Sequence, residues 1–282
     1  MRDGYAISSK PTRETNMEQV VRDMVGRSIT EYYPGRTNEP GEIVLEVKNF
    51  CQEGLFNNIS FKLRKGEILG VAGLMGAGRT EIMRALFGVD SCKHGEVYLH
   101  GKKVCIKKPE DAIKAGIGFI TENRKSEGLI LDFSISRNIA LPSVDTFAKR
   151  SVINAKNETA FSEALSKKLG VKTASIDLEA GALSGGNQQK VVIAKWIGMN
   201  PSIIIMDEPT RGIDVGAKRD IYDLMNELTS QGVAIIMVSS ELPEVIGMSD
   251  RILVIHEGKI AGELDHEEAT QEKIITLATG GQ

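Results

Sequence analysis

A glycine-rich stretch at residues 73–80, GLMGAGRT, carries the clearest chemistry in the chain. It fits the phosphate-loop template G-x-x-x-x-G-K-[ST] at every fixed position except one, where Arg79 replaces the lysine. Such a loop holds a phosphate because consecutive backbone N–H groups surround the anion at a helix N-terminus, and glycines allow the tight path. Taken alone, the stretch is equally consistent with a structural glycine-rich turn.

The predicted nucleotide contacts span the whole loop. Thr80 can place its hydroxyl on Mg²⁺. Arg79 keeps the positive charge of the lysine but is bulkier and planar, so the exchange is not conservative. The residues that we expect to bind the nucleotide are Gly73, Leu74, Met75, Gly76, Ala77, Gly78, Arg79, Thr80 and Glu81.

Two consecutive carboxylates follow an apolar run in SIIIMDEP (202–209). The pattern is the Walker B motif, in which a buried strand carries its last residues to the edge of the sheet where ligands bind in open α/β folds. Asp207 is expected to hold the Mg²⁺ shell, and Glu208 to polarise the attacking water as a general base. The alternative is a pair of carboxylates that only caps a strand end.

A second glycine-rich turn opens the stretch LSGGNQQKVVIAKW (183–196). A serine and two glycines at a helix start make another anion-binding turn. LSGG followed by glutamines marks the ATP-binding cassette family, and over about residues 43–282 the chain resembles an ATP-binding cassette. The strings GLMGAGRT, LSGGNQQKV, DEPTRGIDVGAK (207–218) and SSELPEV (239–245) are most similar to the second cassette of the fused double-cassette subunits of bacterial monosaccharide importers, nearest to the ribose type.

The resemblance implies roles for further residues. The signature loop of the family contacts the γ-phosphate of ATP held by the opposite cassette. The residues of this chain expected to make that contact are Leu183, Ser184, Gly185, Gly186, Asn187 and Gln188. The D-loop position falls on Gly212–Asp214, with Gly212 and Asp214 as its expected site residues. Phe50 and Phe56 are candidates for the aromatic ring that stacks on adenine, and core packing is the alternative that we favour for both.

Two positions depart from the family's pattern. Glu122 replaces the Q-loop glutamine, and its carboxylate can still reach Mg²⁺ but cannot donate a hydrogen bond when ionised. Ser240 replaces the switch histidine, and a serine has no comparable ability to carry a proton near pH 7. The expected catalytic residues are therefore Glu208, Glu122 and Ser240, and the expected metal ligands are Thr80, Asp207 and Glu122.

These departures all belong to one of the two nucleotide sites of the expected pair of cassettes. Arg79, Glu122 and Ser240 all belong to the site that this chain's own phosphate loop builds, whereas the signature loop is intact. In a head-to-tail pair of cassettes the two loops belong to different composite sites. The hypothesis is that this cassette's own site is degenerate and that its signature completes the site of the other cassette. Because Glu208 is retained, slow hydrolysis at this chain's own site stays open.

The elements that must position these loops alternate between strand and helix, which predicts an α/β fold with a mainly parallel sheet. The expected strands are Glu67–Ala72, Ile117–Thr121, Ser202–Met206, Val233–Val238 and Arg251–Ile255. The expected helices are Arg79–Phe87, with Ile82, Met83 and Leu86 inside, and the amphipathic Val215–Ser230, with Ile221, Leu224, Met225 and Leu228 on one face. Residues 123–183 are expected to form a helical subdomain, and the resemblance adds an antiparallel β subdomain to this P-loop NTPase fold.

The first residues raise a separate question. Residues 2–26 resemble residues 256–280 without a gap, at an offset of 254 and with four identities in 25 positions. Tails made of a turn and a helix look alike by chance, but an internal repeat at one domain length is an architectural signal. We expect residues 1–32 to be the tail of a preceding related cassette, 33–42 a linker and 43–282 the nucleotide-binding domain.

Composition narrows the functional class. The 282 residues carry 35 basic and 38 acidic side chains, and this balance gives no electrostatic case for a nucleic-acid partner. No apolar run approaches the ~20 residues that a membrane helix needs. The three cysteines show no CxxC spacing and are expected to be reduced thiols without a zinc site.

We therefore expect an ATP hydrolase with ATP and Mg²⁺ as cofactors that energises uptake of a ribose-like monosaccharide and is weakly active as an isolated fragment. The expected partners are an N-terminal cassette of the same polypeptide, an integral membrane permease and, indirectly, a sugar-binding protein, at the cytoplasmic face of the bacterial inner membrane. Residues 128–133 are a candidate permease contact, with ordinary loop packing as the alternative. The competing functions are a self-sufficient homodimeric ATPase and a nucleotide-gated clamp that does not hydrolyse ATP.

Overall fold

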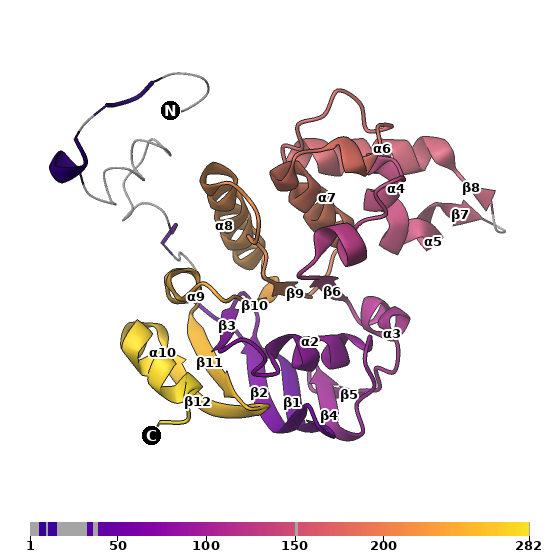
Figure 1. Ribbon diagram of the computed structural model, residues 1–282. Coiled ribbons are helices and arrows are strands. Elements are labelled where there is room, and N and C mark those ends of the chain that lie inside the picture. The colour runs from indigo at the N-terminus through magenta and orange to yellow at the C-terminus, as the bar shows by residue number, and fades with distance from the viewer. Residues whose placement is uncertain (1–5, 10, 16–32, 36–38, 150–151, 282) are drawn as a thin grey trace.

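The computed structural model describes residues 6–9, 11–15, 33–35, 39–149 and 152–281. Most of the predicted repeat at residues 2–26 and most of the predicted tail lie outside the described residues. Within the described part, the chain forms a six-stranded sheet of order β12-β11-β3-β10-β9-β6 and a four-stranded sheet of order β2-β1-β4-β5 (Figure 1). The predicted α/β fold is confirmed.

Five strands of the larger sheet are parallel, and β12 pairs antiparallel with β11 at one edge. Every residue of β9 and β10 is buried, which explains the apolar runs Ile203–Met206 and Ala234–Val238. In sheet order the strands are β12 (Lys259–Asp265), β11 (Arg251–His256), β3 (Ile68–Gly73), β10 (Ala234–Val238), β9 (Ile203–Asp207) and β6 (Ile117–Ile120). The five predicted strands are confirmed, with each end within about one residue of its expected position.

The smaller sheet is the antiparallel β subdomain that the resemblance implied. Its strands are β1 (Ile43–Gln52), β2 (Phe56–Arg64), β4 (His94–Leu99) and β5 (Lys102–Val104), and all neighbouring pairs are antiparallel. Along most of β2, buried and exposed residues alternate, so one face of this sheet packs on the core and the other faces water.

Helices pack on both sheets and carry the loops of interest. α2 (Arg79–Phe87) contacts β3, β6 and β9, and α8 (Val215–Ser230) contacts β10. Both have the predicted bounds, and the expected inner residues are buried except Leu224, which is half-buried. The other helices outside the helical region are α3 (Pro109–Lys114), α9 (Leu242–Met248) and α10 (Gln271–Ala278).

Between β6 and β9 the chain is mainly helical. Figure 1 shows α4 to α7 grouped to one side of the sheets. The segments are a π-helical turn (Arg124–Gly128), α4 (Ile135–Ala140), α5 (Val144–Phe147), α6 (Ala155–Lys168) and α7 (Gly185–Ile197), with the short strands β7 (Ala148–Lys149) and β8 (Val152–Ile153). Short 3₁₀ turns lie at Thr12–Glu14, Leu141–Ser143, Ala180–Ala182 and His266–Glu268. None of the helices in the described part of the chain has both the length and the apolar composition needed to cross a bilayer.

Candidate functional site

The phosphate loop joins β3 to α2 and lines a pocket of about 630 Å³, called here the nucleotide pocket. Gly76 has a φ of 76° and Gly78 a φ of 100°, both in the left-handed region that favours glycine. A Cβ at Gly78 would lie 3.3 Å from the carbonyl oxygen of Leu55. All the predicted loop residues, Gly73 to Glu81, line the pocket, so the structure gathers them around one space.

The other walls of the nucleotide pocket come from distant parts of the sequence. Glu122, Glu208 and Ser240, which the sequence predicted, line it. Residues that the sequence reasoning missed also line it, namely Arg211, Leu242, Ile274, Ile275 and Ala278. Arg211 lies inside the quoted string DEPTRGID, so its loop was marked although its role was not. The apolar residues of α10 gave no signal, because their pattern is that of ordinary core residues.

Asp207 ends β9 beside the nucleotide pocket and is only 1% exposed. Neither of its carboxylate oxygens makes a well-formed hydrogen bond among the described residues, although the Thr80 side chain lies near. Its pKa is raised to about 6, chiefly by burial and also by the charge of Glu208, against the opposing effects of the nearby Thr80 and of Arg79. Two buried oxygens without a well-formed hydrogen bond fit Mg²⁺, which is commonly held by one or two carboxylates and the phosphates of a substrate.

Glu208 follows Asp207 with a φ of 49°, a conformation that a residue with a side chain seldom adopts. Its backbone N–H donates to the carbonyl of Val238 at 2.8 Å, which fixes the turn after β9 to the end of β10. Ser240 donates its hydroxyl to Oε2 of Glu208 at 3.1 Å. Burial raises the pKa of Glu208, and the hydrogen bond from Ser240 and the charge of Arg79 lower it. The structure therefore connects Glu208, the predicted general base, by a hydrogen bond to Ser240, which the sequence analysis placed at the position of the switch histidine.

Arg79 reaches across the pocket floor toward β10. Its Nη1 donates to the carbonyl oxygen of Ser239 at 2.7 Å, and its Nη2 lies 4.0 Å from Oε1 of Glu208. Both side chains of this ion pair are 11% exposed, so water screens the pair only weakly. The guanidinium of Arg79 is thus bound to Ser239 and Glu208, and a phosphate would have to replace these contacts.

Glu122 lies just beyond the end of β6 and forms an ion pair with Arg211. The next arginine along the chain, Arg124, donates Nη1 to the carbonyl of Arg211 at 2.8 Å and Nη2 to that of Gly212 at 3.2 Å. The segment after β6 therefore contacts Arg211 through both side chains and the first residue of the predicted D-loop, Gly212, through Arg124. Sequence reasoning named Glu122 and Gly212 but missed Arg124.

The signature turn, Leu183–Gln188, opens α7 and does not line the nucleotide pocket of the same chain. Asn187 donates to the hydroxyl of Ser184 at 3.0 Å, and the side chain of Gln188 is buried against the carbonyl of Ala180. A Cβ at Gly185 would lie 2.7 Å from Nη2 of Arg124, so the guanidinium packs against the glycine backbone of this turn. Asp214 of the predicted D-loop caps α8 by accepting from the N–H of Ala217 at 3.0 Å.

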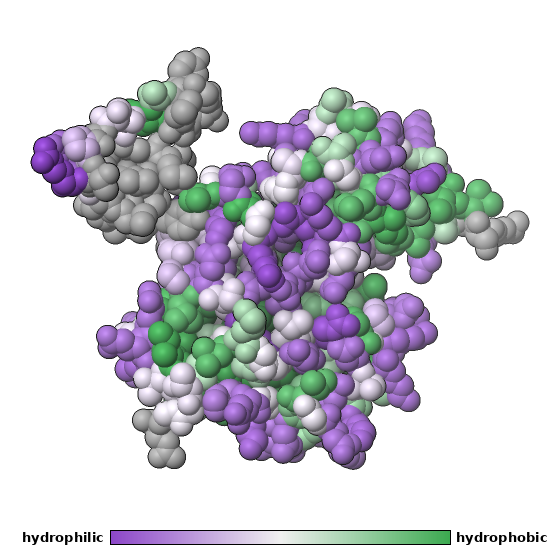
Figure 2. Space-filling view, viewed as in Figure 1, coloured by the Kyte–Doolittle hydropathy of each residue, from purple (hydrophilic) through white to green (hydrophobic). Residues whose placement is uncertain are grey.

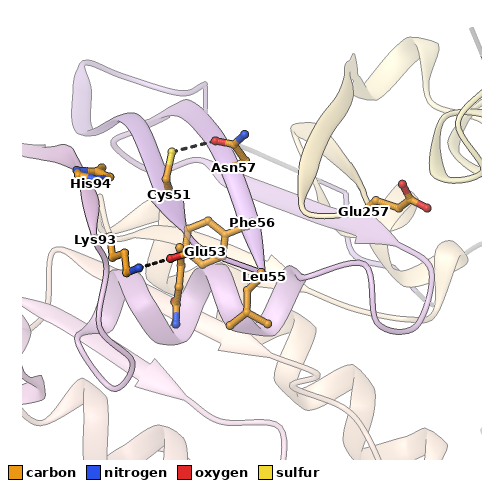
Figure 3. A pocket seen from close by; sticks show the side chains of 10 residues that line it. Cys51, Glu53, Leu55, Phe56, Asn57, Lys93, His94 and Glu257 are labelled. Carbon is orange, nitrogen blue, oxygen red and sulfur yellow. Dashed lines mark hydrogen bonds and ion pairs between the residues drawn. The ribbon is translucent and has the colours of Figure 1, made fainter.

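The two candidates for adenine stacking are core residues. Phe50 and Phe56 stack on each other with ring centroids 5.5 Å apart, and each is 4% exposed. Figure 3 shows Phe56 beside a second pocket, of about 550 Å³, that Glu53, Lys93 and the thiol of Cys51 also line. The core-packing interpretation is confirmed for both rings. The three cysteines are free thiols.

The chain has a phosphate loop between β3 and α2, two carboxylates at the end of β9 and a second glycine-rich turn on a helical region. Together these features define a P-loop nucleotide-binding cassette. The family model of the ABC transporter matches residues 56–211, and the chain belongs to this family.

Curated relatives give a finer likeness. The chain is 61% identical over 281 residues to the ribose import ATP-binding protein RbsA of Oceanobacillus iheyensis, and 61% identical over 282 residues to that of Bacillus subtilis. Each match covers 100% of this chain and 57% of the relative, so the chain spans a little over half the length of those proteins.

Solved structures show the same fold. One is an ATP-binding cassette of an ABC transporter in its ADP conformation, with a TM-score of 0.69, 23% identity and coverage of 84% of this chain and 99% of that chain. Another is a dimeric post-hydrolysis state of an ATP-binding cassette bound to ADP and Pi, with a TM-score of 0.67, 22% identity and coverage of 79% of this chain and 98% of that chain.

Proposed function

We propose that this chain is the C-terminal cassette of the ATP-binding subunit of a bacterial importer for ribose or a similar monosaccharide. The names of the relatives support the substrate class, and their greater length supports a second cassette in the same polypeptide. Such a subunit works at the cytoplasmic face of the inner membrane with a permease and a sugar-binding protein. The observation that carries the proposal is the contrast between an altered nucleotide pocket and an unaltered signature turn.

The chain's own pocket is suited to binding ATP but hydrolyses it only slowly. Arg79 and Ser240 both contact Glu208, and neither residue can do what lysine and histidine do at these positions. When bound, Mg²⁺ supplies positive charge to the β- and γ-phosphates. Thr80 and Asp207 would hold the ion, with Glu122 as a further candidate once it leaves Arg211.

The signature turn serves the site of the other cassette. Ser184 and Gly185 stand at the N-terminus of a 13-residue helix, where the N–H groups and the helix dipole favour an anion. The turn lies outside the nucleotide pocket of its own chain, as a surface that serves a partner should.

ATP binding and single-turnover hydrolysis on this chain test the proposal. We expect Mg²⁺-dependent binding with slow hydrolysis. In the longer polypeptide, Ser184→Ala together with Gly185→Ala should abolish steady-state hydrolysis, whereas Ser230→Ala at an exposed helix end should not. Fast turnover by these 282 residues alone favours the homodimeric ATPase, and tight binding without hydrolysis favours the clamp.

We also propose a permease contact that keeps only the exposed part of residues 128–133 and extends it along a neighbouring groove. Gly128 and Leu129 are buried, whereas Ile130 and Phe133 are about 40% exposed, at 41% and 38%. Phe133 opens a groove of about 360 Å³ that runs along α4 and reaches Ile153 of β8. Figure 2 shows apolar side chains gathered over this part of the helical region.

A cysteine at Ile153 should crosslink to the assembled permease, and a cysteine at Lys167, exposed on α6, is the matched control. Equal crosslinking at both positions, or none at Ile153, would contradict this contact.

A further inference from the structure

Glu244 on α9 is a buried carboxylate to which the motifs give no role. Its side chain belongs to a residue only 1% exposed, yet each carboxylate oxygen has a hydroxyl donor. Thr210 donates to Oε1 at 2.8 Å, and Ser239 donates to Oε2 in a short hydrogen bond. Burial raises the pKa of Glu244, and the hydroxyls of Ser239, Thr210 and Tyr222 lower it. Thr210, Ser239 and Glu244, called here the Glu244 clamp, come from three separate segments.

The two hydroxyl partners belong to the two segments that meet at Glu208. Thr210 lies two residues after Glu208 and is 1% exposed. Ser239 directly precedes Ser240, whose hydroxyl contacts Glu208. The carboxylate of Glu244 therefore joins the loop that carries the predicted general base to the strand end that carries its hydrogen-bond donor.

The same strand end also receives the cation of the phosphate loop. Nη1 of Arg79 donates to the carbonyl of Ser239, whose own hydroxyl accepts from the N–H of Glu241 at 3.0 Å. Ser239 is fully buried, so its position is set by these contacts rather than by water. Movement of Ser239 would shift Arg79 and Ser240 together, and both contact Glu208.

A clamp of this kind suits the backbone of Glu208. Its left-handed φ of 49° is a conformation that persists only when its surroundings hold it. The N–H of Glu208 is fixed to Val238 at the end of β10, and the Glu244 clamp fixes the chain on either side of that bond. The parallel pairing of β9 with β10 ends at Asp207 and Val238, so the clamp extends the connection between the two segments beyond the sheet.

We propose that Glu244 is a positioning residue for Glu208: by tying Thr210 to Ser239 it sets where the general base lies relative to the attacking water. The inference rests on the proposed function, in which this chain's own pocket binds ATP and hydrolyses it slowly. Glu244 touches neither nucleotide nor metal in this scheme and acts only through its two partners.

Single-turnover hydrolysis and ATP affinity, measured separately on the chain, test the inference. Glu244→Met removes both acceptors while filling a similar volume, and Glu244→Gln keeps an acceptor and the side-chain shape. We expect Glu244→Met to lower the rate at saturating ATP about 10- to 100-fold, as displacement of a catalytic group by about 1 Å does. ATP affinity should change less than about threefold, because the phosphate loop is untouched, and Glu244→Gln should restore most of the rate.

Val245→Ala is the matched control, because it alters a buried residue on the same helix without touching the clamp. It should lower the stability of the chain and leave the rate unchanged. A double-mutant cycle adds a second readout: Ser240→Ala should slow the unaltered chain and have little further effect in Glu244→Met.

Equal rates in Glu244→Met and the unaltered chain would overturn the inference, as would an unaltered chain that binds ATP without any Glu208-dependent hydrolysis. The proposed function fails independently of Glu244 if the unaltered chain shows no Mg²⁺-dependent ATP binding, and the inference alone fails if the unaltered chain hydrolyses ATP slowly and Glu244→Met does so at the same rate.

Discussion

Asp207 is expected to destabilise the chain in the absence of nucleotide. Its carboxylate is buried, makes no well-formed hydrogen bond among the described residues and has its pKa raised, chiefly by burial, from 3.8 to about 6. An acid whose pKa is higher in the folded state binds its proton more tightly there than in the unfolded chain. Its effect on stability is therefore favourable only while it is protonated, and it is lost as the pH rises from about 4 to about 6.

The size of this effect follows from the two pKa values. At 1.36 kcal/mol per pKa unit, a rise from 3.8 to about 6 corresponds to about 3 kcal/mol of stability lost between pH 4 and pH 7. Asp207→Asn keeps the shape of the side chain but removes the titration. The free energy of unfolding of Asp207→Asn, relative to the unaltered chain, should therefore rise by about 2–3 kcal/mol over this interval.

Urea unfolding at pH 4, 5, 6 and 7, without nucleotide or Mg²⁺, measures this difference. Asp132→Asn, at an exposed position, is the matched control and should show no such trend. A flat difference between Asp207→Asn and the unaltered chain would refute the reasoning, and so would one that falls as the pH rises. The same substitution should abolish the Mg²⁺ dependence of ATP binding. Asp207→Asn should therefore make the folded chain more stable while it removes a function of the site.

Three further substitutions test other contacts. Arg79→Lys should release Glu208 and raise the single-turnover hydrolysis rate of this chain by about tenfold, and an unchanged rate would show that the arginine does not limit the site. Arg124→Met should remove the hydrogen bonds to the carbonyls of Arg211 and Gly212 and lower the free energy of unfolding by about 1–3 kcal/mol, whereas a loss below about 0.5 kcal/mol would contradict a structural role. Gly247→Ala places a Cβ 2.5 Å from the ring of Tyr33 and should expose residues 33–35 to limited proteolysis, and unchanged protection would show that this contact does not hold them.

The elements of the fold were predictable because each depends on a local pattern. β10 has apolar residues at every position and β9 at every position before its last residue, Asp207, which is the pattern of strands buried on both faces. α8 has the 3.6-residue period of an amphipathic helix and begins at Asp214, a residue type that caps helices. The phosphate loop, the Walker B carboxylates and the signature turn are likewise continuous strings, so each could be found without knowledge of its neighbours.

The contacts between these strings were not predictable, because they join residues far apart in sequence. Arg124 and Gly212 are 88 positions apart, and Arg79 and Ser239 are 160 apart. Glu244 stood inside a quoted string, but its acceptor role depends on a hydroxyl 34 positions away. No periodicity specifies such pairs, and they follow only once the parallel sheet brings the loops after β6, β9 and β10 to one edge.

The same edge connects the nucleotide pocket to the signature turn through a short series of side chains. Glu122 lines the nucleotide pocket and pairs with Arg211, whose carbonyl oxygen accepts from Arg124. Arg124 in turn rests on Gly185 of the signature turn. A nucleotide that draws Glu122 toward its metal would loosen Arg211, and the shift would reach the signature turn through one further side chain. The pair between Glu122 and Arg211 is exposed to water and contributes little stability by itself, so we expect any effect of Glu122→Gln on the signature turn to pass through the hydrogen bonds of Arg124.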